Sequence, residues 1–588
     1  MTTHFTGGGL VRTVGDEGRA MRIAIVGLGS RGLSVLEQFI GLARQAPDLR
    51  LRIDVFEPRT PGPGLHDTEQ PDYLMLNTMA GQLCAFSTAY PAGDSPGMTF
   101  LQWCQATDVR LDERGHLADG GRPVGYGDFV PRRLLGRYLH YCYRFLLRQC
   151  PGNLRVRHQA ETVSLCQALP ERAGFRLTTA SGWQQACDAL FITVGHAPQT
   201  PLPEVTGTRV AIEGLGLTAM DTLARLTEGR GGRFVRDAGF AGWRYQPSGR
   251  EPRLFLYSRS GLPFHARPAG SPSVKRKWPR LFLTAQAIDA VRHSSDGRRL
   301  DFRADVLPLL EDEMRAVFYQ ATVQHQAPEC LAAVQQRLAE AASQGGRGAI
   351  FEALAERWGR FEPGDWMPAE PWSGRDEDYA GWFRRWITED LALSRAGAAR
   401  SPLRQALEVW RDDRDALRHA VDRNGLTDRS TQDFYSVWTA VSNRLVGGPQ
   451  LERYEDLLAL LEAGVVTPLA PDAARKQRFD TLIRARVATG GASSHGLLAD
   501  LYRQGLVRIA HPWPADGIET DALGRALRRD GSPHSRLWVL GPSVEGCTFY
   551  NHYVSTPDPA CLAPLQARTA AQSCLASLAG AHAPADCV

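Results

Sequence analysis

The chain has 588 residues, of which 43% are hydrophobic and 22% charged, the composition of a globular protein with roughly three to four domains' worth of chain. The 68 basic and 64 acidic residues leave a formal net charge of +4 without a long basic run, so a nucleic-acid partner is not expected. The 11 cysteines include no C-x-x-C pair, which argues against a disulfide framework and a metal site.

The amino-terminal segment shows no targeting signal. Residues 1–20 lack the apolar core of a secretory signal and are expected to form a flexible tail. The whole chain also lacks a run of about 18 apolar residues, so no membrane partner is expected. These features predict a cytoplasmic protein.

The first folded element expected is a nucleotide-binding unit, "MRIAIVGLGSRGLSVLEQFI". The apolar start predicts a strand, the glycines a tight turn, and the apolar residues at helical spacing a helix. In such a turn the first glycine permits the bend, the second lets the backbone approach a pyrophosphate, and the third lets the helix pack on its strand. The next strand closes on a carboxylate suited to a ribose hydroxyl pair. The predicted dinucleotide-binding residues are therefore Gly27, Gly29, Gly32 and Glu57.

The following segments are less specific. "YLMLNTMAGQLCAF" places Asn77 and Thr78 inside an apolar stretch, where their polar groups need partners. A cofactor ring would supply them, but an ordinary buried turn would do so equally well. A helix is predicted to begin near Pro131. Further on, "CDALFITVG" predicts a strand that runs into a loop at Gly195.

A second glycine turn follows in "TRVAIEGLGLTAMDTLARL", again between a short strand and a helix. It reads Gly214-x-Gly216-x-x-Ala219, and two such units in one chain are much more specific than one. The next strand carries Arg259 near its end, where an arginine can accommodate the 2′-phosphate that distinguishes NADPH from NADH.

The rest of the chain predicts a helical region and then a return to both sheets. Eight tryptophans lie between Trp278 and Trp438, for which core packing is the expected role of most and an aromatic-walled substrate pocket the alternative for a few. Short strands are predicted at "GVVTPLAP" and "GLVRIAHP". The strand 537–540, which runs into Gly541, is expected to complete the first sheet, so that its loop faces the cofactor.

The predicted fold class is therefore α/β, a Rossmann-like flavoprotein with two dinucleotide-binding domains and a large helical insertion. The predicted organisation is a tail (1–20), a first part of the FAD-binding domain (21–205), a first part of an NAD(P)-binding-like domain (206–280), a mainly helical insertion or substrate domain (281–463), a return to both domains (464–536), and the closing strand with a C-terminal helix (537–588).

With these segments, the chain resembles the bacterial FAD/NAD(P)-binding family and, more loosely, the class B flavoprotein monooxygenases, which include ornithine and lysine N-hydroxylases and flavin-containing monooxygenases. The resemblance rests on "IAIVGLGSRGLSVLE", "LMLNTMAGQL", "FVPRRLLGRYL", "GLGLTAMDTLARLTEGRGGRF", "PSGREPRLFLYSRSGLP" and "LGPSVEG". It implies FAD at the first turn and NADPH at the second, where Gly214, Gly216, Thr218 and Asp221 match the pattern G-x-G-x-S-A-x-D with Thr in place of Ser. The F-x-G-x-x-x-H fingerprint is not found, and Pro542 stands where many flavoproteins have Asp.

The resemblance implies an FAD- and NADPH-dependent monooxygenase-type oxidoreductase. NADPH would reduce the flavin, O₂ would react with it, and one oxygen atom would pass to a small nucleophilic metabolite, for example an amino-acid-derived amine that becomes N-hydroxylated. Asn77, Thr78, Asn551 and His552 are the candidates for supporting catalytic roles, although each residue type is also common in structural hydrogen bonding.

Two alternatives remain open from the sequence. One is an FAD-dependent oxidase or dehydrogenase that does not use a nicotinamide, and the other is a non-catalytic, flavoprotein-derived binding protein. A homo-oligomer is compatible with the sequence, and the identity of the small-molecule substrate is not determined by it.

Overall fold

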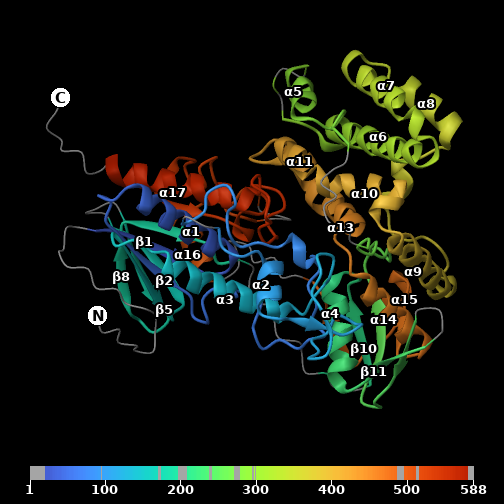
Figure 1. The fold of residues 1–588 in the computed structure, drawn as a ribbon, viewed down its shortest axis with the longest axis horizontal. Helices are drawn as coiled ribbons and strands as arrows, with labels where there is room; N and C mark the ends of the chain where they lie inside the picture. The colour runs from blue at the N-terminus through green and yellow to red at the C-terminus, as the bar shows by residue number, and fades with distance from the viewer. Residues whose placement is uncertain are drawn as a thin grey trace.

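The computed structural model describes residues 20–93, 96–169, 174–195, 205, 208–237, 242–269, 278–294, 297, 299–486, 496–511 and 516–580. These residues form two sheet-containing halves and a helical lobe that rises above the second half (Figure 1). The predicted α/β fold with two dinucleotide-binding units is confirmed. Except for residue 20, the predicted tail lies outside the described residues.

The first sheet has six strands, and β1 lies in its interior. In spatial order they are β16 (Arg525–Leu527), β17 (Pro533–Val539), β9 (Ala189–Ile192), β1 (Met21–Val26), β2 (Leu51–Phe56) and β5 (Leu154–Gln159). All pairs are parallel except β16 with β17. The strand near the C-terminus therefore completes the first sheet beside β9, as predicted.

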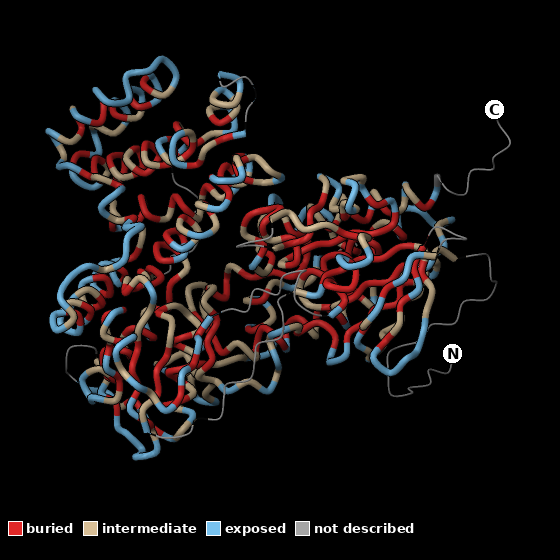
Figure 2. Tube along the Cα trace, turned by 180° about the vertical axis from the view of Figure 1, so that it is seen from behind, coloured by how far each residue is buried: buried red, intermediate tan, exposed pale blue. Residues whose placement is uncertain are grey.

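Both faces of this sheet are covered. The helices α1 (Ser30–Gln45), α3 (Arg132–Arg148) and α17 (Leu562–Gly580) lie on one face, and the small sheet β6 (Val163–Ala168), β7 (Phe175–Thr179) and β8 (Gln184–Cys187) lies on the other with α16 (Leu497–Arg503). Figure 2 shows the central strands as buried. Phe191 of β9 stacks on Trp538 of β17 with ring centroids 5.1 Å apart. Burial on both faces explains why the interior strands β1 and β9 are mostly apolar.

The second sheet has four parallel strands in the order β14 (Val466–Pro468), β13 (Arg253–Tyr257), β10 (Arg209–Glu213) and β15 (Thr481–Arg484). The helices α4 (Leu217–Leu226), α9 (Tyr379–Arg395) and α14 (Leu451–Glu462) share its hydrophobic core. Two helices from the predicted insertion thus pack on this sheet. The strand predicted at "GLVRIAHP" is wrong: Arg508 donates to the Leu527 carbonyl while Ile509 pairs with Ile518, so no continuous ladder forms.

The helical lobe has its own core, in which Trp278, Trp410 and Trp438 are buried, so core packing is confirmed for these tryptophans. The lobe contains α5 (Ala285–Ser294), α6 (Leu307–Gln326), α7 (Leu331–Gln344), α8 (Arg347–Trp358), α10 (Pro402–Asp412), α11 (Arg414–Val421), α12 (Asp428–Asp433) and α13 (Thr439–Val446). The remaining elements are α2 (Phe100–Ala106), α15 (Pro471–Arg475), and the hairpins β3 (Arg110–Leu111) with β4 (Arg122–Pro123) and β11 (Arg233–Arg236) with β12 (Trp243–Gln246).

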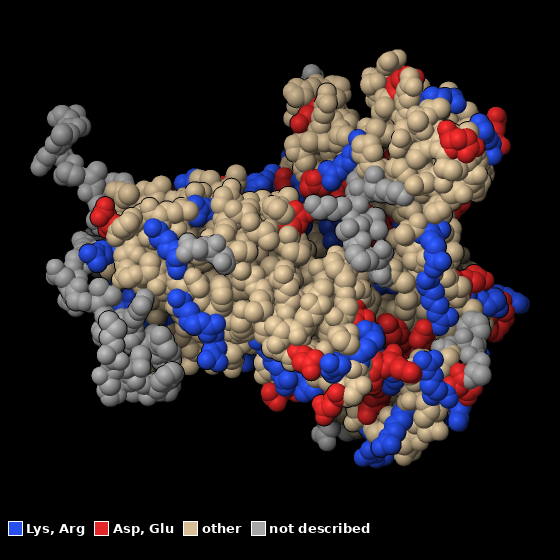
Figure 3. Space-filling view, in the orientation of Figure 1, with Lys and Arg blue, Asp and Glu red and all other residues tan. Residues whose placement is uncertain are grey.

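The surface gives two further observations. On the face drawn in Figure 3, basic and acidic side chains are intermixed over the second half and sparser over the first. Among the described helices, none combines the length and hydropathy needed to cross a membrane.

Candidate cofactor and substrate site

The first glycine turn lies where the strand order of the first sheet reverses, because β1 continues to β2 on one side and pairs with β9 on the other. Parallel sheets bind ligands at such a point. Gly27 has φ +89°, and a Cβ there would lie 2.8 Å from the Thr193 carbonyl oxygen. A Cβ on Gly32 would lie 2.4 Å from the Gly27 oxygen, whereas one on Gly29 would meet only the Gly64 Cα, at 3.6 Å. The turn is therefore packed on the protein side and open in front of Gly29, which fits a pyrophosphate.

Glu57 lies beside this turn and braces it. One carboxylate oxygen accepts a hydrogen bond from the Leu28 N–H at 3.1 Å and the other from the Arg59 N–H at 3.3 Å. The residue is 7% exposed. Glu57 directly follows β2 and lies next to the turn. A carboxylate that binds the ribose hydroxyls of a dinucleotide is expected at this position.

Arg31, in the first turn of α1, is a residue that the sequence reasoning missed. Its Nη2 donates to the Asn551 carbonyl at 3.3 Å, and its guanidinium lies 4.3 Å from the centre of the Tyr553 ring. The Nε and Nη1 atoms are buried without a hydrogen-bond partner. A Cβ on Gly541 would lie 2.8 Å from the Arg31 Cγ, so this glycine leaves room for the arginine. In the sequence, the one feature that points to Arg31 is that it is the single basic residue within the glycine motif.

The second glycine turn repeats the first arrangement in part. Gly214 has φ +145° and lies where β10 is flanked by β13 and β15; a Cβ there would lie 2.6 Å from the Ala485 oxygen. A Cβ on Gly216 would lie 3.2 Å from the Phe264 ring. This turn therefore repeats the close packing of the first glycine, whereas the Phe264 ring covers Gly216 at the position that is open in front of Gly29.

The other residues assigned to nucleotide binding have different surroundings. Thr218 is in the first turn of α4, where its carbonyl accepts from the Thr222 hydroxyl at 2.8 Å. Asp221 forms an ion pair at 2.9 Å with Arg132 of α3, so it joins the two halves. Arg259 is exposed, just beyond β13. Gly195 has φ +72° and open space around it, beyond the end of β9.

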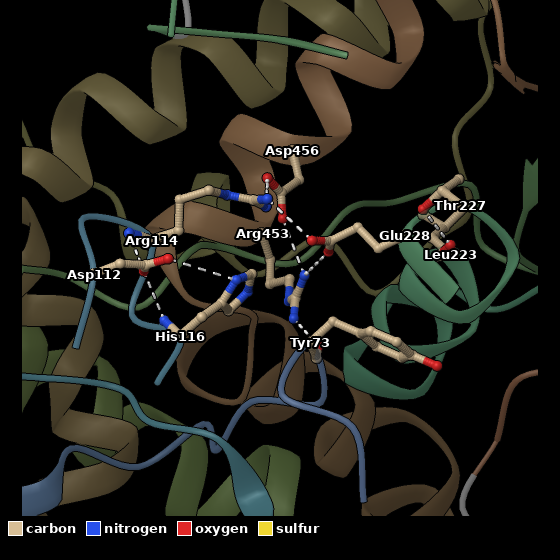
Figure 4. Close-up of polar contacts among 9 residues, drawn as sticks. All are labelled: Tyr73, Asp112, Arg114, His116, Leu223, Thr227, Glu228, Arg453 and Asp456. Carbon is tan, nitrogen blue, oxygen red and sulfur yellow. Dashed lines mark hydrogen bonds and ion pairs between the residues drawn. The ribbon is translucent and has the colours of Figure 1, made fainter. Parts of the chain in front are cut away.

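A buried charge network also joins the halves (Figure 4). Arg114, from the hairpin β3–β4, pairs with Glu228 at 3.0 Å and with Asp456 of α14 at 2.9 Å. Arg453 pairs with Asp456 at 3.0 Å and donates to the Tyr73 carbonyl. Burial raises the pKa of Asp456 against the opposing charges of Arg114 and Arg453. Two cations thus balance two carboxylates where the first half, the second half and α14 meet.

The four candidate catalytic residues lie on two segments. Asn77 and Thr78 are half-buried, and their side chains have no hydrogen-bond partner in the described part of the chain. They follow Leu76, whose carbonyl accepts from Gln450 at the start of α14. The backbone N–H of Cys84 donates to the Ser555 carbonyl at 2.9 Å, which links this segment to the loop after β17.

In that second loop, the Asn551 side chain makes hydrogen bonds within the loop itself. Its Nδ2 donates to the Thr548 carbonyl at 2.8 Å and to Glu545 at 3.0 Å, and the residue is 4% exposed. His552 is exposed, with Nε2 3.5 Å from the Glu545 carboxylate. Asn551 therefore has a structural role, because its backbone carbonyl also accepts a hydrogen bond from Arg31.

The chain is similar to known flavoproteins over most of its length. Residues 24–197 match the FAD-NAD(P)-binding family. The chain is 30% identical to nitrosuccinic acid synthase npaA of Aspergillus oryzae, covering 89% of this chain and 88% of the relative. It is 31% identical to an L-aspartate N-monooxygenase (nitrosuccinate-forming) of Streptomyces cremeus, covering 90% of each. The chain belongs to their family. It is a flavin-dependent oxidoreductase of the monooxygenase type, and the predicted use of FAD with a nicotinamide nucleotide is confirmed.

Among solved structures, the ornithine hydroxylase of Pseudomonas aeruginosa aligns with 95% of this chain and all of its own, with 11% identity and a TM-score of 0.42. The family membership confirms an enzyme rather than a binding protein, and a small molecule as its substrate.

Proposed function

We propose that the protein oxygenates the amine nitrogen of L-aspartate or a closely similar amino acid, with FAD and NADPH. The observation that carries this is the pair of glycine turns, each at the end of an interior strand of its own sheet. A relative that matches 90% of this chain is an L-aspartate N-monooxygenase. An oxidase that needs no nicotinamide would not need a second nucleotide-binding turn.

The first oxygenation balances as one amine, one O₂, one NADPH and one proton giving one hydroxylamine, one NADP⁺ and one water. Bound FAD supplies the redox chemistry that activates O₂. The chain's own residues do the rest: the first turn holds the pyrophosphate, Arg31 adds a buried positive charge beside it, and Glu57 binds the ribose. The network of Arg114, Arg453, Glu228 and Asp456 fixes the two halves relative to each other.

The test follows the absorbance of bound FAD during anaerobic addition of NADPH, then product formation after O₂ and L-aspartate are admitted. We expect the flavin to bleach with NADPH and the hydroxylamine to form on one oxygenation. Nitrosuccinate, detected by mass spectrometry, requires two further oxygenations that each consume one O₂ and one NADPH, so NADPH is supplied in excess. Flavin that stays oxidised with NADPH but is bleached by an amine substrate would replace this proposal with an oxidase. Succinate and L-alanine serve as control compounds, because the first lacks the amine and the second the side-chain carboxylate.

A further inference from the structure

Three arginines from two segments converge between the helical lobe and the second half: Arg267, after β13, and the pair Arg411 and Arg414, at the end of α10 and the start of α11. We call them the arginine cluster. The Nη1 of Arg267 lies 3.3 Å from the Val446 carbonyl, and Arg411 donates to the same oxygen. Two guanidinium groups therefore approach one another at a single acceptor. Arg267 is 8% exposed.

The cluster carries more positive charge than the surrounding residues balance. Glu408 pairs with Arg411. The acids next to Arg414 in sequence, Asp413 and Asp415, are both bound by Arg280. Neither Arg267 nor Arg414 has an acidic partner in the described ranges, and the Nε atom of each is buried without a hydrogen bond. Burying like charges together is costly unless an anion compensates them.

Tyr550 faces the cluster in a strained conformation. Its φ of +60° is rare for a residue with a side chain. Glu545 holds it by accepting from its N–H at 2.9 Å, and Arg418 by donating to its carbonyl at 2.9 Å. The Arg414 guanidinium lies 3.4 Å from the centre of its ring. Hydrogen bonds to both its N–H and its carbonyl hold Tyr550 in this strained conformation, so the fold fixes the position of its ring and hydroxyl.

The electrostatics agree with this geometry. Burial, with the charge of Arg411, lowers the pKa of Arg267 to about 9, and burial lowers that of Arg414 to about 10. Burial acts to raise the pKa of Tyr550, but the charges of Arg414, Arg411 and Arg267 outweigh it and lower the pKa. A bound anion would relieve all three arginines at once.

The loop that carries Tyr550 connects the cluster to the first nucleotide turn. It follows β17 and Gly541, and it contains Asn551 and Tyr553, which contact Arg31. The side chain of Arg418 lies 5.6 Å from the Tyr553 ring and also holds Tyr550. A ligand at the cluster is therefore separated from the cofactor turn by a few residues of one anchored loop.

We propose that Arg267, Arg411 and Arg414 bind the carboxylates of a dicarboxylic amino acid substrate, with the Tyr550 hydroxyl as a further donor. This inference rests on the proposed function and adds its specificity-determining residues. Paired carboxylates match planar guanidinium groups, which form two parallel hydrogen bonds to each carboxylate. A monocarboxylic amine would leave part of the charge unbalanced, so the cluster selects for a dianion.

A second arginine-rich place is a cleft of about 630 Å³ near α11 and α17. It borders the same loop, since Arg418 lines it. Two of its four arginines are in ion pairs, however: Arg292 pairs with Asp289 at 3.0 Å and Arg299 with Asp428 at 2.7 Å. Asp415 and Asp422 also line the cleft, so it lacks the excess of positive charge found at the arginine cluster.

The experiment measures binding to the FAD-loaded protein in the presence of NADP⁺ by calorimetry, with succinate as the probe, since it is a dianion that has no amine to oxygenate. Arg267→Gln and Arg414→Gln should each weaken succinate and L-aspartate binding by about 10- to 100-fold, the loss expected for charge-assisted hydrogen bonds. Arg400→Gln is the matched control, because Arg400 is an exposed arginine that donates to its own segment at Ala396. FAD content and melting temperature check the fold of each variant.

Glu408→Gln gives a result of the opposite sign. Removing the one carboxylate that pairs with the cluster should tighten succinate binding by roughly threefold or more, whereas a merely structural cluster would show no tightening. This variant decides the matter if Arg267→Gln fails to fold. Tyr550→Phe should weaken binding by a smaller factor, since it removes only the hydroxyl.

The outcomes separate the two proposals. Succinate binding that is unchanged in Arg267→Gln and Arg414→Gln, or that is absent from the wild-type protein, overturns the assignment of the cluster even if L-aspartate is oxygenated. Succinate binding lost in these variants, with no oxygenation of L-aspartate by the wild type, overturns the proposed function and leaves a dicarboxylate site that serves another substrate.

Discussion

Two glycines of the first turn, Gly29 and Gly32, should respond differently to the same substitution by alanine. The Cβ of Gly29→Ala enters space where the nearest atom is 3.6 Å away, so the protein should fold normally. That space is where the pyrophosphate must approach the backbone, so FAD should be lost. The Cβ of Gly32→Ala would lie 2.4 Å from the Gly27 oxygen and 3.1 Å from the Thr193 hydroxyl. It should therefore damage the fold as well as the cofactor site.

The magnitudes follow from these distances. Alanine in place of Gly29, at the N-cap of α1, should change the free energy of unfolding by at most about 1 kcal/mol. Alanine at position 32 forces α1 away from β1, and such overpacking costs about 1–3 kcal/mol. With roughly 2–4 °C of melting temperature per kcal/mol, the second variant should melt several degrees lower and the first close to the wild type.

The assay is thermal unfolding of the FAD-stripped proteins by circular dichroism, followed by FAD titration of each. We expect Gly29→Ala to retain its melting temperature and bind FAD at least 10-fold more weakly, a loss of about 1.4 kcal/mol or more. A Gly29→Ala protein with wild-type FAD affinity would refute the pyrophosphate assignment. Equal melting temperatures for Gly32→Ala and the wild type would refute the packing argument.

Three further changes test other parts of the molecule. Arg114→Ala should lower the free energy of unfolding by about 2–4 kcal/mol in a denaturant titration, because it leaves buried carboxylates undercompensated; Arg110→Ala, at an exposed ion pair with Asp108, should cost less than about 1 kcal/mol. Burial raises the pKa of Asp422 to about 7. The folded protein therefore binds more protons at this group than the unfolded chain does between about pH 4 and 7, and stability falls as pH rises through that window. Asp422→Asn should remove this fall and stabilise the protein at pH 8 by about 2–4 kcal/mol, since the amide oxygen can still accept from the Phe549 N–H; an unchanged pH profile would contradict this. Arg259→Ala should weaken NADPH binding much more than NADH binding, and an equal loss of both would remove Arg259 from the 2′-phosphate role.

The candidate site could be predicted from sequence only where its residues are close together in the chain. Both glycine turns, Glu57 and the closing strand before Gly541 were found because each motif is local. Arg31 was present in the first motif, but its importance depends on Tyr553 and the Asn551 carbonyl, more than 500 positions away. Asn551 and His552 were noticed for their chemistry, whereas the structure gives the loop a different central residue, Tyr550.

The sequence by itself determined the local geometry of this protein, because the strand, turn and helix of each nucleotide-binding unit follow from interactions between near neighbours. The groups that a Cβ on the turn glycines would meet, such as the Thr193 carbonyl at Gly27 and the Ala485 carbonyl at Gly214, are distant in sequence. Tertiary structure decided which charges meet. Arg267 is distant in sequence from Arg411 and Arg414, and all three look like ordinary surface arginines in the sequence. Arg114 and Asp456 likewise look like ordinary surface charges. Packing between the two halves and the helical lobe decides whether these charges are buried and whether opposite charges compensate them. The free-energy cost of burying a charge is set by what surrounds it in space.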